Sequence, residues 1–347
     1  MNRELGCYLL AGPSDDPRKI IDEVRAAEEL NLGTAFLSER FDVKEAATLS
    51  GAAGAASERI RIATAATNHN TRHPMVTAAY ATTMHRLTRG RFMLGLGRGG
   101  AQAFAAWNLP AVTTAQLEDF AGLMRRLWRG ETIRDHDGPA GRYTRLRLDP
   151  RFDETIPLGL VALGPQTLAL GGRAFDEVVL HTYFTDETLA RSVRIVKEAA
   201  ERTGRDPASV RVWSCYATIG DHIPEPRRLR ATAGRLATYL QIYGDLLVST
   251  NRWDPAVLAR FRADPVVANV RGAIDAVATD DQVEHISGLL PAEWLSAAAQ
   301  GSAQQCAASV RAQLRVGADA VIMHGATPTE LAPVVSAYRE SMPSPQY

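Results

Sequence analysis

The sequence has few cysteines and no excess of charge of either sign. Its three cysteines, Cys7, Cys215 and Cys306, are far apart, and no C-x-x-C pair occurs, so they make neither a zinc-ligand pattern nor a disulfide framework. We expect them to be reduced, buried thiols of a cytoplasmic protein. Lys plus Arg number 39, as do Asp plus Glu. This balance argues against a general binder of nucleic acid or of anionic membranes, although a local basic patch stays open.

Long apolar runs and metal motifs are also missing. No apolar stretch reaches the roughly 18 residues that a membrane span needs, and the first apolar run is too short for a signal peptide. No H-E-x-x-H occurs, and Pro74 disfavours a helix that would bring His69 and His73 to one metal ion. We therefore expect a soluble protein without a metal site, which acts on a small molecule and not on nucleic acid or a membrane.

What is present is a regular alternation of two patterns. Short apolar runs predict strands at 7–12, 34–39, 60–67, 91–97, 156–164, 177–182, 210–220 and 320–325. Amphipathic patterns predict helices at 16–31, 43–57, 73–87, 115–130, 186–204, 303–317 and 328–341, with a short one from about 165. This alternation predicts a parallel α/β sheet, and eight units close most economically into a (β/α)8 TIM barrel. An open doubly wound sheet is the alternative.

Two segments interrupt the alternation. Residues 131–155, after the fourth strand, combine turn dipeptides with alternating residues and predict a hairpin. Residues 224–299, after the seventh strand, are mostly helical in pattern. Because no convincing linker or repeat occurs, we expect residues 1–347 to form one domain with two insertions. Aromatic residues of the second insertion favour core packing, with an apolar lid or an oligomer contact as alternatives: Tyr239, Tyr243, Trp253 and Phe261.

Polar residues gather just after the predicted strands. The stretch IRIATAATNHNTRHP (60–74) is apolar at first and then runs into Asn68 and His69. In barrels of this kind, binding and catalytic groups lie at the carboxyl ends of the strands. We therefore interpret these residues as the rim of a site. Further candidates follow the other strands: Glu39, Arg40, Arg98, Gly99, Gly164, Pro165, Gln166, Thr167, His181 and His324.

Two glycine-containing stretches at this rim suggest ligand contacts. GLGRGG (95–100) matches G-x-G-x-x-G in letters, but it follows the fourth strand and no helix is predicted directly behind it, so a dinucleotide fingerprint is disfavoured. We expect these glycines to let the backbone approach a flat or phosphorylated ligand. In GPQTLAL, the helix start near Thr167 predicts either an anion site or an ordinary cap, and the sequence does not separate the two.

The segment AFLSERFDVKEAATLSGAAGAASERIRIATAATNHNTRHPMVTAAYATTMHRLTRGRFMLGLGRGG resembles the core of the luciferase-like monooxygenase superfamily, and more closely its branch that uses the deazaflavin coenzyme F420. GPAGRY and GADAVIMHG resemble further parts of that family. The resemblance implies a TIM barrel that transfers hydride between F420 and an organic substrate. It implies coenzyme contacts at Glu39, Asn68, Arg98, Gly99, Gly164 and Pro165, and a non-proline cis peptide at Ala65–Ala66. Relatives are often dimers, so it also allows a homodimer.

The sequence departs from the family at two acid–base positions. Where some relatives have a catalytic histidine and a glutamate, this chain has Arg40 and Gly100, which makes a sugar-phosphate dehydrogenase doubtful. Arg40 is a poor proton acid, so we expect it to hold an anionic substrate or coenzyme oxygen. His69 ranks first as proton carrier, before His181 and Glu39. An FMN-dependent monooxygenase, a non-catalytic F420-binding protein and a metal-dependent hydrolase are the alternatives.

Overall fold

A ring of parallel strands forms the centre of the protein. The computed structural model describes residues 2–12, 14, 16–41 and 44–341. The strands lie in the hydrogen-bonded order β10-β9-β11-β1-β2-β3-β4-β7-β8, and an additional pairing of β9 with β8 closes eight of them into a (β/α)8 barrel. The predicted barrel is thereby confirmed, and the open sheet is excluded. The eight strands are β1 (Asn2–Tyr8), β2 (Leu32–Leu37), β3 (Arg61–Thr64), β4 (Phe92–Leu96), β7 (Leu158–Ala162), β8 (Glu177–Leu180), β9 (Arg211–Gly220) and β11 (Ala320–His324).

Most of the barrel strands are short, and most of their residues are buried. Every residue of β2 and of β8 is buried, as is usual where helices cover a parallel sheet. This double burial explains why their sequences are nearly continuous apolar runs. The register places Phe36 opposite Ala63 and Gly95 opposite Gly159. A ninth strand, β10 (Ala299–Gly301), adds to the end of β9 and was not predicted.

Packing divides the chain into two compact units. The first unit comprises Met1–Gly33, Leu180–Val193 and Trp213–Tyr347, and the second comprises Thr34–Val179 and Arg194–Val212. Both units draw on segments that are distant in sequence. The interpretation of residues 1–347 as a single domain stays a prediction.

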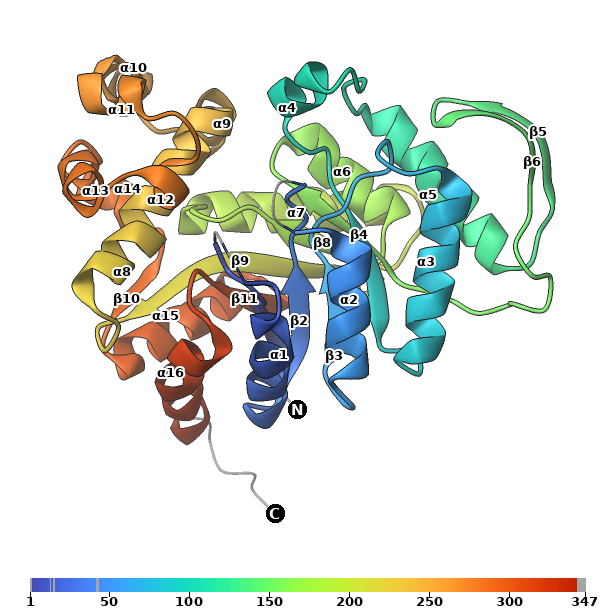
Figure 1. The fold of residues 1–347 in the computed structure, drawn as a ribbon, viewed down its shortest axis with the longest axis horizontal. Helices are drawn as coiled ribbons and strands as arrows, with labels where there is room; N and C mark the ends of the chain where they lie inside the picture. The colour runs from blue at the N-terminus through green and yellow to red at the C-terminus, as the bar shows by residue number, and fades with distance from the viewer. Residues whose placement is uncertain (1, 13, 15, 42–43, 342–347) are drawn as a thin grey trace. The chain divides into compact units, whose positions relative to one another are not determined.

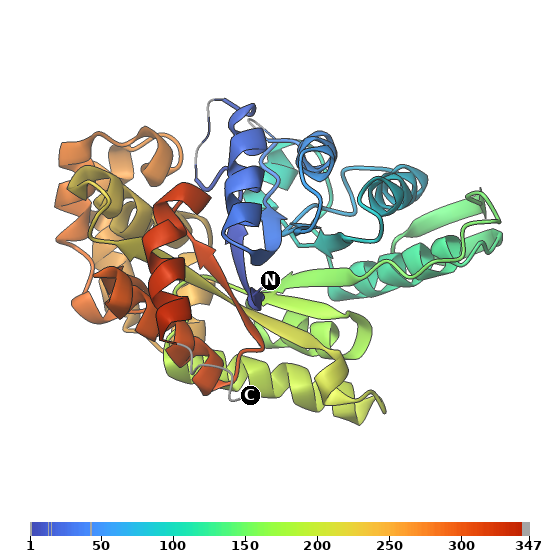
Figure 2. The ribbon, with the colours of Figure 1, turned by 90° about the horizontal axis from the view of Figure 1, so that it is seen from below.

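The second unit holds four of the predicted helices and the predicted hairpin. Helix α3 begins at Pro74, where the His73 ring accepts the backbone N–H of Met75, and α5 begins with a capping box of Thr113 and Gln116. The hairpin runs alongside α5 in both views (Figures 1 and 2). Besides barrel strands, the second unit contains α2 (Ala46–Ala55), α3 (Pro74–Leu87), α4 (Ala101–Ala106), α5 (Thr114–Trp128), β5 (Ile133–Gly138), β6 (Gly141–Leu146), α6 (Pro165–Ala174) and the 3-10 turn at Pro207–Ser209.

The first unit carries the helical segment that was predicted after the seventh strand. That segment starts with α8 (Glu225–Leu229) and a π-helical turn, η2 (Arg230–Gly234), which leads directly into α9 (Arg235–Asn251). The backbone of Tyr243 leaves helical geometry inside α9, so this helix is kinked. The other helices are α1 (Lys19–Glu29), α10 (Pro255–Ala263), α11 (Pro265–Asn269), α12 (Ile274–Val277), α13 (Asp280–Ser287), α14 (Ala292–Leu295), α15 (Ala303–Val316) and α16 (Pro328–Glu340), while α7 (Asp186–Arg202) belongs in part to each unit.

Two local predictions were wrong. The first strand is Asn2–Tyr8 and not 7–12, because its register with β11 runs through Leu5 to Cys7, and the chain turns at Leu10 with a positive φ of 50°. A helix, α4, does begin directly after GLGRGG, with Gly100 as its N-cap residue. It has only six residues. The barrel topology, and not the absence of a helix, therefore excludes the dinucleotide-binding fold.

Candidate functional site

The end of β3 is irregular and remains bonded to both neighbouring strands. The Ala65–Ala66 peptide is cis, at the position that the resemblance indicated. The N–H of Ala65 donates to the carbonyl of Leu37 at 2.7 Å, and the N–H of Thr67 donates to the carbonyl of Gly95 at 3.0 Å. Ala65 and Ala66 thus connect the ends of β2, β3 and β4 in the second unit.

Glu39 lies inside a closed network of hydrogen bonds. Its side chain is fully buried and pairs with the guanidinium of Arg72. The Thr67 hydroxyl donates to Glu39 Oε2 at 2.7 Å, and the N–H of Ala46 donates to Oε1 at 3.1 Å. Arg72 also donates to Thr67 Oγ1 at 2.8 Å and pairs with Glu45. The carboxylate therefore anchors Arg72 and the start of α2, and its predicted contact with coenzyme or substrate would require this network to open.

Arg40 is fixed through its main chain. It forms an isolated antiparallel bridge with Lys44, with N···O distances of 2.9 and 2.6 Å. Its side chain is half-buried. The bridge holds Arg40 in the loop after β2, and its predicted role in holding an anionic oxygen stays a prediction.

Three glycines at the end of β4 and just after it lie close to the protein's own atoms, and their predicted approach to a ligand stays a prediction. A Cβ on Gly95 would lie 1.8 Å from the carbonyl oxygen of Thr64, and one on Gly97 would lie 2.8 Å from the Cβ of Ala66. Gly99 has a φ of +68°, and a Cβ there would meet the ring of Phe104 at 2.3 Å. These three positions accommodate the protein's own atoms. They do not by themselves indicate a ligand.

Asn68 and Arg98 tie the ends of several second-unit elements together. The Asn68 amide donates to the carbonyl of Gly97 at 2.8 Å. The Arg98 guanidinium donates to the Thr167 hydroxyl at 3.1 Å and to the carbonyl of Val112 at 2.9 Å, and it also bonds to Thr114. Burial lowers the pKa of Arg98 below its ordinary value. Arg98 thereby connects the end of β4 with the starts of α5 and α6.

The start of α6 offers backbone donors that no described side chain caps. Gly164 is the N-cap residue, Pro165 opens the helix, and Gln166 is exposed. The hydroxyl of Thr167, the residue that suggested either a cap or an anion site, accepts from Arg98 instead of capping the helix. Pro165 has no N–H, and the N–H groups of Thr167 and Leu168 donate to the carbonyl of Gly164 at 3.1 and 3.0 Å. Among the described residues, this first turn therefore offers an anion the N–H of Gln166 and the positive end of the helix dipole.

His69 is buried next to α5. Its ring lies 5.5 Å from the ring of Phe120 between centroids, and its Nδ1 has no hydrogen-bond partner among the described residues. Burial lowers the pKa of His69 to about 4, so the ring is neutral at neutral pH. A buried nitrogen without a partner is rare and indicates a group that a ligand could satisfy.

His181, the third predicted proton carrier, belongs to the first unit. Its ring packs against Tyr239 and Tyr243 of α9, with centroids 4.6 and 5.0 Å away. Its Nδ1 donates to the carbonyl of Thr182 at 3.0 Å, which leaves the lone pair of the neutral ring on Nε2. Burial lowers its pKa to about 4, against the effect of this hydrogen bond. The His324 ring lies 5.2 Å from that of Tyr8 in the same unit.

The four aromatic residues singled out in the helical segment divide between two roles. Tyr239 and Tyr243 are half-buried against His181. Phe261 is 1% exposed, and Trp253 stacks on Trp294 with centroids 4.4 Å apart. Phe261 and Trp253 therefore pack as expected of core residues, whereas the two tyrosines surround an imidazole.

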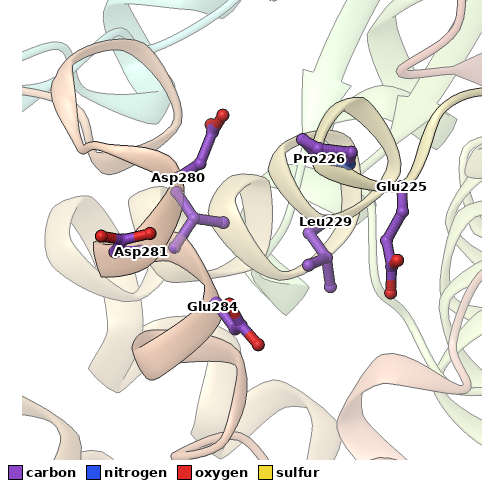
Figure 3. A pocket seen from close by; sticks show the side chains of 7 residues that line it. Glu225, Pro226, Leu229, Asp280, Asp281 and Glu284 are labelled. Atoms are coloured by element: carbon purple, nitrogen blue, oxygen red, sulfur yellow. The ribbon is translucent and has the colours of Figure 1, made fainter.

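The first unit contains two charged pockets. One is lined by Arg227, Arg230 and Arg235 together with residues that follow β1 and β11. The other lies between α8 and α13 and is acidic, with Glu225, Asp280, Asp281 and Glu284 (Figure 3). In Figure 3 the carboxylates of Asp280 and Asp281 point in different directions. Accordingly, the described residues include no group of three or more His, Cys, Asp or Glu arranged to hold a metal ion.

Sequence reasoning missed Arg72, Tyr239 and Tyr243 as members of these clusters. Arg72 stands in the polar stretch after β3, which was a usable signal, but its partner Glu39 is 33 positions away. The two tyrosines are four positions apart and so share one face of a helix, a pattern that equally fits core packing. Within the part of the chain that the structure describes, no helix is long and apolar enough to span a membrane.

The fold and these strand-end clusters define a TIM-barrel protein with polar groups at the carboxyl ends of its strands. The chain belongs to the luciferase-like monooxygenase family, whose model matches residues 3–320.

Comparisons with individual proteins agree with this assignment. Over 318 residues, the chain is 23% identical to a 5,10-methylenetetrahydromethanopterin reductase from Methanolobus tindarius, which covers 89% of this chain and 91% of that protein. The structure of a coenzyme F420-dependent tetrahydromethanopterin reductase from Methanopyrus kandleri has a TM-score of 0.81 at 18% identity and covers 97% and 98% of the two chains. The oxygenating constituent of 3,6-diketocamphane monooxygenase from Pseudomonas putida, in complex with FMN, has a TM-score of 0.65 at 15% identity, with 99% and 100% covered.

Proposed function

We propose that this protein is an F420-dependent oxidoreductase that transfers a hydride between the deazaflavin and a small organic substrate. The observation that carries the proposal is the uncapped start of α6 at Gly164 and Pro165, next to the Arg98–Thr167 contact. F420 and FMN both carry a phosphoryl group, and the N–H of Gln166 at a helix start beside the Arg98 guanidinium offers donors that suit it. The buried, unpartnered Nδ1 of His69 in the described structure is a second group in this unit that a ligand could satisfy.

In this proposal the chain's own residues position the coenzyme and exclude water. Gly164 to Thr167 would hold the phosphoryl group, and Asn68 and Gly99 would border the ring as the family resemblance implies. Bound F420 would supply hydride chemistry at its C5 atom. Glu39 and Arg72 would not contact the coenzyme. They would fix the loop after β3, because their donors and acceptors are already engaged with each other.

FMN is the alternative coenzyme, because the 3,6-diketocamphane monooxygenase of the same fold holds FMN. The start of α6 does not distinguish the two, since both ligands carry phosphate. Two features favour F420: the sequence resemblance to the F420 branch, and the higher TM-score with an F420-dependent reductase. A non-catalytic F420-binding protein remains as the third reading, because both acid–base positions of some relatives are replaced.

Binding titrations separate these proposals. The purified protein is titrated with F420 and with FMN, and binding is followed by fluorescence and calorimetry. We expect saturable F420 binding and FMN binding at least about tenfold weaker, a difference of about 1.4 kcal/mol. The reverse preference, together with oxygen consumption by the reduced FMN complex, would reject F420. Tight F420 binding without turnover over a broad substrate panel would favour the non-catalytic protein.

The proton carrier is tested by substitution of each histidine. General acid–base catalysis contributes about 10²–10⁴-fold, so loss of the correct group should lower kcat by that factor while the Kd for F420 is retained. We expect this for His69→Phe, because Phe fills the volume beside Phe120 without a proton-carrying atom. The matched change is His181→Phe, and the variant with the larger fall in kcat identifies the carrier. Glu39→Gln should act mainly on stability.

We also propose a homodimer, because relatives are often dimers. Sedimentation analysis of the purified chain checks this directly. A mass of twice 37.6 kDa supports the dimer, and a mass of 37.6 kDa at all concentrations contradicts it.

A further inference from the structure

A pocket in the first unit carries more cationic than acidic side chains. Among the described residues, its charged lining consists of four cationic residues, Lys19, Arg227, Arg230 and Arg235, and two acidic residues, Glu23 and Asp275. The remaining wall includes Gly325, directly after β11. We call this the arginine pocket. It lies within one compact unit, beside the chain that follows the first and the last barrel strands.

Arg235 provides a buried cation with unused donors. Its side chain is 5% exposed, and its Nη2 lies 2.6 Å from Oδ2 of Asp275, whose side chain is 2% exposed. The guanidinium also lies 5.7 Å from the ring centroid of Tyr239. Arginine has five N–H donors, yet among the described residues Arg235 makes no side-chain hydrogen bond beyond this ion pair. A Cβ on Gly12 would lie 3.1 Å from Arg235 Nη2, so this nitrogen comes close to the loop after β1.

Arg227 and Arg230 are held by acids that do not line the pocket. Arg227 Nη2 donates to the carbonyl of Gly325 at 2.9 Å and to Oε2 of Glu330 at 3.3 Å. Arg230 Nη2 donates to Oδ1 of Asp280 at 2.5 Å, and its Nη1 donates weakly to the carbonyl of Asp275 at 3.4 Å. These contacts fix one side of each guanidinium and leave other N–H groups for a ligand.

Nearby acidic side chains balance the cationic side chains of the arginine pocket, so that the pocket can form without a bound anion. Counted over the described residues, four cations of the lining face two acids, and the two outer acids Glu330 and Asp280 balance the remaining charge. The cluster therefore needs no counter-ion to fold. An entering anion would still meet fixed guanidinium donors in a partly buried place, where charge-assisted hydrogen bonds are strong.

The position agrees with a general property of TIM barrels. Anions commonly bind near the loops that follow the last two strands and at an extra helix there. The arginine pocket is built from the residues after β11 and from the helices that follow β9. We propose that the arginine pocket binds an anionic group, a phosphate ester or a carboxylate, of the substrate. That the pocket binds an anion does not depend on the proposed oxidoreductase function. That the anion belongs to the substrate rests on it.

Inorganic phosphate and succinate test the pocket without any coenzyme. Binding to the wild-type chain is measured by calorimetry and compared with that of the double variant Arg227→Gln/Arg230→Gln. Loss of two charge-assisted contacts should weaken binding at least about tenfold. The matched control is Arg262→Gln, an exposed arginine of α10 that pairs with Asp245 outside the pocket, and it should bind as the wild type does. Circular dichroism checks that each variant is folded.

The outcomes separate the pocket from the coenzyme proposal. Saturable binding of phosphate or succinate that the double variant loses supports the pocket, whether or not the chain binds F420. Absence of saturable binding, or equal binding by the double variant and the wild type, overturns it even if F420 binds. If the double variant loses F420 affinity by the same factor as phosphate affinity, the anion belongs to the coenzyme and the assignment to the substrate is overturned.

Discussion

Arg72 is half-buried and Arg235 is buried, and each faces a buried carboxylate, but their surroundings differ. Arg72 contacts Glu39, Glu45 and the Thr67 hydroxyl, and Glu39 receives further hydrogen bonds from Thr67 and the backbone of Ala46. Arg235 has one ion pair and a ring contact. Around Arg72 the protein's own groups satisfy the guanidinium. Around Arg235 the described residues leave N–H donors without a hydrogen-bond partner, and the proposed anion site rests on this difference.

The largest expected effect is that of Arg72→Met. This change leaves the buried Glu39 without its counter-charge, so the free energy of unfolding should fall by about 3–5 kcal/mol. Urea denaturation followed by circular dichroism measures the fall. Arg262→Gln, which breaks an exposed pair, is the control and should show no measurable change. Equal midpoints for the two variants would remove the structural role given to Arg72.

The second effect tests whether the ends of β3 and β4 are packed by the protein's own atoms. In Gly95→Ala the new methyl group would overlap the Thr64 carbonyl oxygen, so we expect a loss of about 1–3 kcal/mol or more. Gly122→Ala is the control, because a Cβ at this position in α5 meets no described atom within 4 Å. The control should gain about 0.5–1 kcal/mol from helix propensity. A neutral Gly95→Ala would restore the interpretation that this glycine leaves space for a ligand.

The third test removes both charges of the first-unit pair. Arg235→Met with Asp275→Leu should change stability by less than about 2 kcal/mol, since apolar residues of similar size often replace a buried pair without loss. Thr238, whose hydroxyl bonds to Asp275, also reaches the carbonyl of Gly234 at 3.1 Å and keeps that partner. Phosphate binding should nevertheless fall at least about tenfold. A large stability loss with unchanged phosphate binding would make Arg235 as structural as Arg72.

The last test is a pH dependence of stability within the second unit. The pKa of His69 falls from 6.5 to about 4 on folding, so the unfolded chain binds more protons between these values. Stability should therefore decrease as pH falls from 6.5 toward 4. Burial opposes ionisation of Glu45, but hydrogen bonds from Thr48 and Ala47 and the contact with Arg72 lower its pKa from 4.5 to about 2, and its contribution is lost below pH 4.5. We measure the urea midpoint as a function of pH. In His69→Gln the decrease of the midpoint between pH 6.5 and about 4 should be smaller than in the wild type, and the decrease below pH 4.5 should be unchanged.

The barrel was predictable because each of its elements carries its own periodicity. Strands such as β2 and β8 are buried on both faces and appear as continuous apolar runs, and α3 and α5 have clear start signals. The failures have local causes. The apolar run around Leu9 and Leu10 is buried by the turn after β1 and not by the strand, and α4 is too short to show a period.

The candidate site was predictable only in part. The cis bond at Ala65–Ala66 was confirmed, and the interpretation of the polar residues after β3 as the rim of a binding site stays a prediction. Their partners could not be read, because hydrogen bonds such as that of Arg98 to Thr167 join residues 69 positions apart. The glycines were an ambiguous signal. Space for a ligand and space for a neighbouring strand impose the same residue type.

The π-helical turn at Arg230–Gly234 has a consequence for the evolution of this pocket. A π turn accommodates one more residue than an α-helix, and one residue corresponds to about 100° of helix rotation. Removal of a single residue from this turn would make the helix regular and would swing Arg235 and Tyr239 away from their present direction together. In a related sequence, the deletion of one residue from this turn could therefore remove the arginine from the pocket without any change in the barrel.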